Sequence, residues 1–173
     1  MFAKTDLLTH VNLVNHAYWN LNKNKDLINN HHILINAEQY LENNHQNIPT
    51  GKKINVEGTP FDFRKWKILG NQIKLNKKGF DENFIMKSNY NARIYSPQSG
   101  ILLTFYSNQP GLQFYTGQHL KFKSNKKKLF PFQGLCLETQ AFPNSPNNKN
   151  FPNTVLKPNE LYKHKMMIKI THQ

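Results

Sequence analysis

Short runs of apolar or alternating residues, separated by clusters of turn-forming residues, recur along this chain. Runs of this kind lie at 33–35, 54–56 and 165–170, and turn clusters lie at 49–51 and 97–100. A period of two residues is typical of a β-strand, because successive side chains point to opposite faces. Residues 22–57 show no extended helical period. The succession of short strands and turns predicts an all-β sandwich.

One short run, residues 134–140 (GLCLETQ), carries a single carboxylate in its middle. In a strand, alternation places Glu138 on the face opposite Leu135 and Leu137. A carboxylate held beside apolar neighbours loses hydration, and its pKa then rises toward the range of a general base at neutral pH. For an isolated strand residue, an exposed glutamate on a half-solvated face is the commoner alternative.

Length and composition restrict the classes of protein to consider. The 173 residues suffice for one domain with a core, and aromatic residues make up 12% of them, which argues against disorder. The formal net charge is +13, which would suit a nucleic-acid or anionic surface. Most of the lysines are scattered through asparagine-rich segments, however, and the one run, residues 126–128, is read as a solvated loop. We therefore expect no nucleic-acid partner.

The cysteine count and the apolar segments of the sequence bear on the cellular compartment. Cys136 is the only cysteine, so an internal disulfide is impossible and a reducing compartment is compatible. No stretch approaches the ~20 apolar residues of a membrane helix. The first ten residues lack the apolar core of a signal peptide. We expect a cytoplasmic protein with no membrane partner.

The segment after the GLCLETQ run carries an ordered series of motifs. It reads FP at 142–143, SPN at 145–147, FPNTVLKP at 151–158 and then Tyr162. Taken with LETQ at 137–140, this series resembles the C-terminal signature of the aldose 1-epimerases, the galactose mutarotases. In that family the LETQ glutamate takes the proton of the anomeric hydroxyl. The resemblance implies this role for Glu138.

A histidine near the start of the chain lies in a second motif. Residues 11–21 read VNLVNHAYWNL, and the alternation of Val11 and Leu13 predicts a strand with His16 at its end. The segment resembles the family's VNLTNHSYFNL, whose histidine protonates the ring oxygen of the sugar. The resemblance implies that His16 is the general acid. The alternative is a structural histidine that donates to a backbone carbonyl near aromatic rings.

Two further motifs imply sugar-binding residues. GFDENF at 79–84 resembles a family segment whose aspartate accepts hydrogen bonds from sugar hydroxyls, and Asp81 matches it. Glu82 replaces the family's histidine; if it faces the cleft, it adds charge beside Asp81. QPGLQFYTG at 109–117 resembles the family's QPGVQFYTG, which implies a sugar contact for Gln113, an amide that can donate and accept. An Asp capping a turn and an amide on a solvated face are the alternatives.

Other segments are given structural roles. GTPFDFR at 58–64 also resembles a family segment, and we expect Asp62 and Arg64 to be partners there. A short helix is expected within 64–75, β-hairpin structure over 92–117 and a closing strand at 165–170. His31 and His32 are interpreted as surface residues, because no Cys or carboxylate lies at metal-ligand spacing nearby.

The resemblance covers most of residues 10–170 and implies an antiparallel β-sandwich of the galactose mutarotase type. The implied reaction interconverts the α and β anomers of a free hexose such as galactose or glucose. Glu138 and His16 would act from opposite sides of one sugar, with no metal and no cofactor.

Two other classes of function remain. A non-catalytic sugar-binding or regulatory module on the same scaffold would bind hexose without accelerating anomer exchange. A basic adhesion or nucleic-acid-binding protein, which the net charge permits, would lose affinity steeply with added salt; we rank it last.

The resemblance begins near the middle of the family's sequences. We therefore expect residues 1–173 to be one mutarotase-like β domain without the family's N-terminal half, which normally brings an arginine and a second histidine to the sugar. The missing strands would leave open sheet edges and apolar surface. We expect either a separately encoded N-terminal half or self-association, with little activity from the isolated chain.

Overall fold

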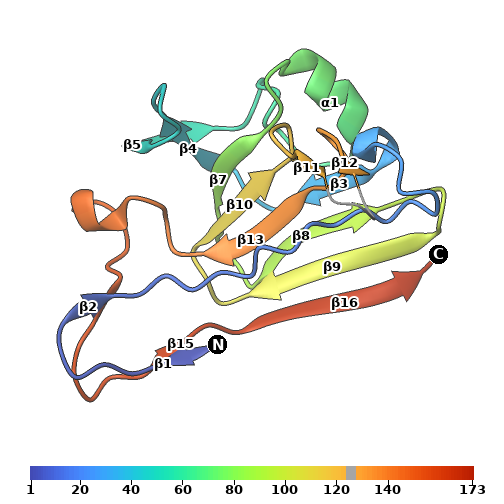
Figure 1. Ribbon diagram of the computed structural model, residues 1–173. Coiled ribbons are helices and arrows are strands. Elements are labelled where there is room, and N and C mark those ends of the chain that lie inside the picture. Colours follow the sequence, from blue (N-terminus) through green and yellow to red (C-terminus); the bar gives the residue numbers. More distant parts are fainter. Residues whose placement is uncertain (124–127) are drawn as a thin grey trace.

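The computed structural model describes residues 1–123 and 128–173 and is built almost entirely from antiparallel β-strands (Figure 1). Of the lysine run interpreted as a solvated loop, Lys126 and Lys127 lie outside the described residues, whereas Lys128 begins a short strand. In the described part, no helix has the length and apolar character needed to cross a membrane.

Two five-stranded sheets form the body of the molecule. The site sheet has, in spatial order, β13 (Cys136–Gln140), β10 (Gly111–Tyr115), β7 (Asp81–Ile85), β4 (Gln39–Asn43) and β5 (Pro49–Asn55). The back sheet has β16 (Met166–His172), β9 (Ile101–Ser107), β8 (Tyr90–Tyr95), β3 (His32–Ile35) and β6 (Lys67–Ile68). Every strand pair within them is antiparallel.

Short pairs of strands tie distant parts of the chain together. They are β1 (Phe2–Ala3) with β15 (Tyr162–Lys163), β2 (Thr9–His10) with β14 (Val155–Leu156), and β11 (Phe122–Lys123) with β12 (Lys128–Leu129). The helical elements are α1 (Leu69–Leu75) and the 3-10 turns η1 (Ile28–Asn30) and η2 (Ser145–Asn147). The first residues of the chain are thus held beside its last strands.

The core lies between the two sheets and is rich in phenylalanine. Phe80 stacks on Phe114 with ring centroids 5.6 Å apart, and Phe63 meets both rings edge-on at 5.1 and 5.4 Å. The back sheet contributes aliphatic side chains such as Ile94 and Leu103 to the same cluster. Edge-to-face and offset aromatic pairs add ~0.5–1.5 kcal/mol each beyond the burial of area. This packing fixes which face of each site-sheet strand points inward.

Several expected elements are confirmed. The β8–β9 pair is a hairpin around residues 96–100, β16 closes the back sheet, and α1 lies within the expected helical stretch. The hairpin structure expected over 92–117 is wrong for its second part: residues 108–110 carry the chain from β9 in the back sheet to β10 in the site sheet, so β9 and β10 do not pair. Residues 49–51, which the sequence suggests are a turn, begin β5 instead.

The expected strand at residues 11–14 is wrong. The described backbone between β2 and Trp19 is extended but belongs to no strand. The reason is competition from amide side chains, which satisfy backbone groups that a strand would pair. Asn12 exchanges two hydrogen bonds with the backbone of Ala141, and Asn15 Oδ1 accepts the Ala17 N–H at 3.1 Å.

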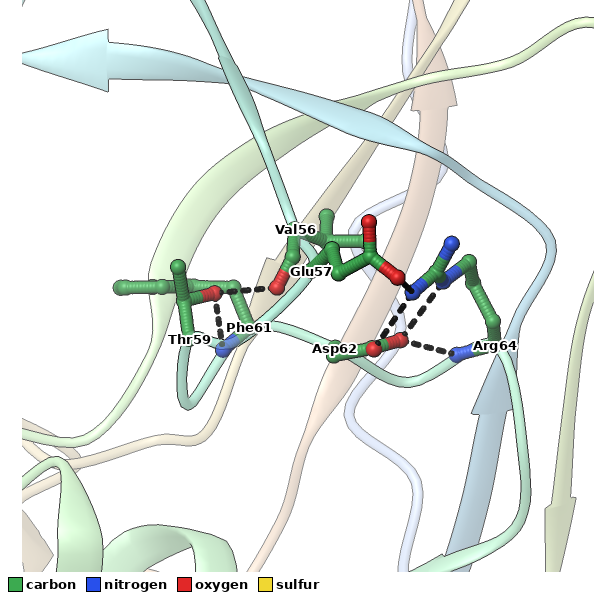
Figure 2. A network of polar contacts seen from close by, with 6 residues as sticks. All are labelled: Val56, Glu57, Thr59, Phe61, Asp62 and Arg64. Atoms are coloured by element: carbon green, nitrogen blue, oxygen red, sulfur yellow. Dashed lines mark hydrogen bonds and ion pairs between the residues drawn. The ribbon is translucent and has the colours of Figure 1, made fainter.

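The expected partnership of Asp62 and Arg64 is confirmed. Arg64 donates from Nε and Nη2 to the two carboxylate oxygens of Asp62 at 2.9 and 2.8 Å, and its backbone N–H donates to the same side chain (Figure 2). Glu57 lies 3.6 Å from Arg64 Nη2. The guanidinium hydrogen bonds hold the pKa of Asp62 below its ordinary value. The pair therefore shapes the loop that delivers Phe63 to the core.

His31 is buried, so its interpretation as a surface residue is wrong; its neighbour His32 is partly exposed. His31 Nε2 accepts the backbone N–H of Leu21 at 2.9 Å, and Nδ1 donates to the carbonyl of Ile28 at 3.2 Å. This pattern requires the neutral ring with its proton on Nδ1. Burial lowers the pKa of His31 to about 4. Residue spacing could not reveal this role, because both hydrogen bonds of the ring go to backbone atoms.

We expect His31 to make the protein acid-sensitive. The pKa of His31 in the folded protein lies below its ordinary value of 6.5. Its contribution to the free energy of unfolding is therefore complete above pH 6.5 and is lost as pH falls toward 4. The loss should reach about 2 kcal/mol between pH 7 and pH 5. Urea unfolding of wild type, His31→Gln and the exposed-site control His45→Gln would measure it. Equal pH dependence in wild type and His31→Gln would contradict this role.

Candidate active site

The outward face of the site sheet collects polar side chains from three neighbouring strands. Cross-strand register aligns them in two rows, because residues directly opposite each other share a face. One row is Asp81, Tyr115 and Cys136, and the next is Asn83, Gln113 and Glu138. The predicted residues Asp81, Gln113 and Glu138 therefore lie on one face, opposite the phenylalanine core.

Gln113 is held in place by its neighbours on β7. Its Nε2 donates to Asp81 Oδ1 at 2.9 Å, and its Oε1 accepts from Asn83 Nδ2 at 3.3 Å. Asn83 is buried, so this bond is shielded from water. The chain of side-chain hydrogen bonds orients the amide of Gln113 and one oxygen of Asp81.

His16 comes from the irregular segment between β2 and η1, which runs alongside β13 (Figure 1). Before His16, the side chain of Asn12 accepts the Ala141 N–H at 2.9 Å and donates to the Ala141 carbonyl at 3.3 Å. After it, Trp19 and Leu135 exchange backbone hydrogen bonds of 2.7 and 3.0 Å. Both attachments are to the residues that flank β13. They fix the segment over the strand that carries Glu138.

The imidazole of His16 reaches two side chains of β13. Its Nε2 lies 3.4 Å from Glu138 Oε1, and its Nδ1 lies 3.5 Å from Cys136 Sγ. The ring stacks on Tyr18 with centroids 5.2 Å apart. The His16 side chain is 51% exposed, whereas that of Glu138 is 7% exposed. The structure thus brings the expected acid and base into contact, and does not place them on opposite sides of a sugar-sized gap.

Burial changes the acidity of the groups on β13. It raises the pKa of Glu138; the nearby His16 acts in the opposite sense, and the charge of Asp81 adds to the rise. Burial, with Glu138 and Asp81 as further causes, also raises the pKa of the Cys136 thiol. Glu138 therefore holds a proton more readily than an exposed glutamate does, as a general base working near neutral pH requires.

Open space adjoins this cluster on two sides. A hollow of about 320 Å³ is lined by residues that include Tyr18, Asn20 and Gln133. A second of about 290 Å³ is lined by residues that include Asp81 and His119. Both linings combine polar side chains with a slightly larger share of apolar surface.

Glu82 does not share the face of Asp81. It lies opposite Phe114 in the sheet register, on the side of the core, and its Oε2 accepts the backbone N–H of Asp81 at 2.7 Å. Burial raises the pKa of Glu82 to about 7. Although the register puts them on opposite faces of β7, Glu82 and Asp81 both line the hollow of about 290 Å³, so the Glu82 carboxyl borders this open space.

Four residues of the cluster, Asn83, Tyr115, Cys136 and Tyr18, were not singled out from the sequence as site residues. Asn83 shares a face with Asp81 two positions earlier, so strand alternation could have identified it. Alternation likewise puts Cys136 on the face of Glu138. Tyr18 could not be found in this way, because its segment is not a strand.

The chain has relatives among known proteins. A family model described as aldose 1-epimerase matches residues 2–169. The chain belongs to the aldose 1-epimerase family. It is 39% identical to human galactose mutarotase and 32% identical to the aldose 1-epimerase of Escherichia coli K12, over 98% and 92% of this chain. It spans about half the length of these relatives, 52% and 50%.

Solved structures related to this aldose 1-epimerase family member share its fold. An aldose epimerase homologue from C. elegans superimposes with a TM-score of 0.92 at 25% identity, covering 99% of this chain and 54% of that one. Galactose 1-epimerase from Lactobacillus acidophilus gives 0.83 at 30% identity, covering 99% and 52%. The expected antiparallel β fold of the galactose mutarotase type is confirmed.

We expect the partly buried Glu82 to weaken the fold at alkaline pH. The pKa of Glu82 in the folded protein is raised from the ordinary 4.5 to about 7. Its contribution to the free energy of unfolding is therefore most favourable below pH 4.5 and declines as pH rises through about 7, by at most about 3 kcal/mol. Glu82→Gln should therefore be more stable than wild type at pH 8 and much closer to it at pH 5.

Denaturant unfolding at both pH values measures this difference. Asp6→Asn, at an exposed site, is the matched control for loss of one negative charge. A Glu82→Gln variant that gains no more stability at pH 8 than the control would contradict the assignment.

Proposed function

We propose that this protein interconverts the α and β anomers of a free hexose such as galactose or glucose, with Glu138 as general base and His16 as general acid. The observation that carries this proposal is the contact between His16 Nε2 and Glu138 Oε1, 3.4 Å apart. Membership of the aldose 1-epimerase family supports the reaction class.

In the proposed reaction, ionised Glu138 removes the proton from the anomeric hydroxyl, and protonated His16 donates one to the ring oxygen. The bond between the anomeric carbon and the ring oxygen breaks, which leaves an open-chain aldehyde. Rotation about the adjacent carbon–carbon bond presents the other face of the aldehyde to the hydroxyl. Ring closure reverses both proton transfers, so each residue regains its starting state.

The contact distance suits this chemistry. The hydroxyl oxygen and the ring oxygen of a hexose are bonded to the same carbon, so an acid and a base that serve them must lie close together. The 3.4 Å separation allows each group to face one of these oxygens from one side of the sugar. Stacking of His16 on Tyr18 supports the ring orientation that this requires.

Asp81 and Gln113 are proposed to hold the sugar hydroxyls. The bond from Gln113 Nε2 to Asp81 Oδ1 directs the two polar groups along the same face as Glu138. An ordered amide and carboxylate lose little conformational entropy on binding, which favours orientation of a flexible polyol. We propose that the reaction occurs in the cytoplasm, which suits the free thiol of Cys136.

We expect Glu138→Gln to abolish most turnover in the active form of the protein while hexose still binds. The amide keeps the size of the side chain but cannot take the proton, and general acid–base groups contribute ~10²–10⁴-fold. His16→Asn should give a loss of the same order. Polarimetry of anomer exchange and calorimetric titration of hexose binding measure the two effects.

Glu160→Gln, on the exposed loop before β15, is the matched control for loss of a carboxylate. If Glu138→Gln retained more than about a tenth of the wild-type rate, Glu138 could not be the essential base. Wild-type protein that binds hexose with no exchange, even when assembled with its second polypeptide, would instead indicate the non-catalytic sugar-binding module.

We also propose that residues 1–173 act as one domain that pairs with a second polypeptide: either a separately encoded equivalent of the other half of the relatives, or another copy of this chain. Among the described strands, β16 pairs only with β9 and so forms an edge of the back sheet. Its Met167 and Ile170 side chains are 57% and 66% exposed. Leu7 and Leu8 also expose most of their apolar surface.

We expect the isolated chain to self-associate and to show little or no mutarotase activity until that second half is supplied. Ile170→Lys should reduce association, because it places a charge on the apolar edge strand; Lys169→Gln on the same strand is the control. Sedimentation velocity and polarimetry, with and without co-expression, test this. A monomer with full activity by itself would rule out the pairing.

A further inference from the structure

Three chemically different metal ligands meet where β13 passes beneath the His16 segment. His16, Cys136 and Glu138 each offer one ligand atom, and these atoms lie within 4.8 Å of one another. We propose that this triad binds a divalent transition-metal ion of the zinc type, and that the bound ion excludes the sugar. Sequence spacing could not indicate such a site, because His16 lies 120 residues from Cys136.

The donor set selects the class of ion. Imidazole, thiolate and carboxylate are the ligands that Zn²⁺ and its close chemical relatives take in proteins, whereas Mg²⁺ and Ca²⁺ prefer oxygen alone. In a tetrahedral site with bonds of 2.0–2.3 Å, ligand atoms lie about 3.5 Å apart. The contacts of His16 with Glu138 and Cys136, 3.4 and 3.5 Å, are already close to this value.

Only a small rearrangement would complete the ligand triangle. The His16 ring now directs a different nitrogen to each partner, and one of its nitrogens must turn toward the ion. The ring can do so because its side chain is half exposed and belongs to an irregular segment. Cys136 and Glu138 are held on a paired strand, so they supply a preformed edge of the site.

The local charge favours a cation. The Glu138 carboxylate is one of the three ligands, and Asp81 lies in the same cross-strand row as Cys136, so carboxylates adjoin the proposed ion position. When a divalent ion binds, the S–H bond of Cys136 breaks, the sulfur binds the ion, and the proton passes to solvent. With three protein ligands, a fourth position stays open to water.

Metal binding would use the two groups proposed to move protons in the reaction. The ion should therefore inhibit anomer exchange competitively with hexose. This consequence rests on the proposed function, whereas binding of the ion itself does not.

Cobalt titration tests the site directly. Co²⁺ bound to a thiolate gives a near-ultraviolet charge-transfer band, and because Cys136 is the only cysteine, that band reports this residue alone. We expect the band in wild type, its displacement by Zn²⁺ and its loss in Cys136→Ser. His16→Asn and Glu138→Gln should each weaken Co²⁺ binding at least about tenfold.

His45→Asn, at an exposed histidine outside the cluster, should leave Co²⁺ binding unchanged. Circular dichroism of each variant checks that it is folded. Two results would overturn the proposal. One is the absence of the thiolate band when Co²⁺ is added to wild type; the other is Co²⁺ binding by His16→Asn and Glu138→Gln with the same affinity as wild type.

Polarimetry separates this proposal from the proposed function. Each variant's exchange rate with Zn²⁺ is compared with its own rate without metal. Competitive inhibition of wild type by Zn²⁺, with an inhibition constant at least about tenfold weaker in Cys136→Ser, supports both the metal site and the catalytic proposal. A thiolate–cobalt band in protein assembled with its second polypeptide, which binds hexose but gives no anomer exchange, supports the metal site and refutes the catalytic proposal. Anomer exchange that Zn²⁺ leaves unaffected refutes the exclusion of sugar by the ion.

Discussion

The packing of phenylalanine rings beneath the site sheet is the interaction on which the candidate site depends. Phe84 and Phe114 come from adjacent strands and join Phe63 and Phe80 in one buried cluster. A slip of one residue in either strand would turn these rings toward solvent and bring polar side chains into the core. The cost of that exchange fixes the register, and the register in turn aligns Gln113 with Glu138.

The position of His16, the proposed acid, has a different physical basis. His16 belongs to no sheet, so hydrophobic alternation cannot position it. Its place is set by the hydrogen bonds that Asn12 and Trp19 make to the backbone at the two ends of β13. The site thus combines a proposed base, Glu138, held by a packed sheet with a proposed acid, His16, held by a few polar contacts.

This difference explains what could be predicted from the sequence. Alternation placed Glu138 opposite Leu135 and Leu137, because burial of one sheet face is encoded locally. The burial of His31 was missed, since its partners are backbone groups, and a strand was wrongly expected before His16, since Asn12 takes bonds that only the folded chain reveals. The side of the strand taken by Glu82 could have been predicted, because alternation alone puts it on the face opposite Asp81.

The short β2–β14 pair and the anchors of the His16 segment have a consequence for biosynthesis. His16 leaves the ribosome among the first residues of this sequence, whereas its anchors Leu135 and Ala141 follow only after more than a hundred others. Until then the segment has no backbone partner on β13 and samples many conformations. Contacts between residues so far apart in sequence are slow to form, because a long loop must close first. Assembly of the acid–base pair is therefore among the latest steps open to the nascent chain.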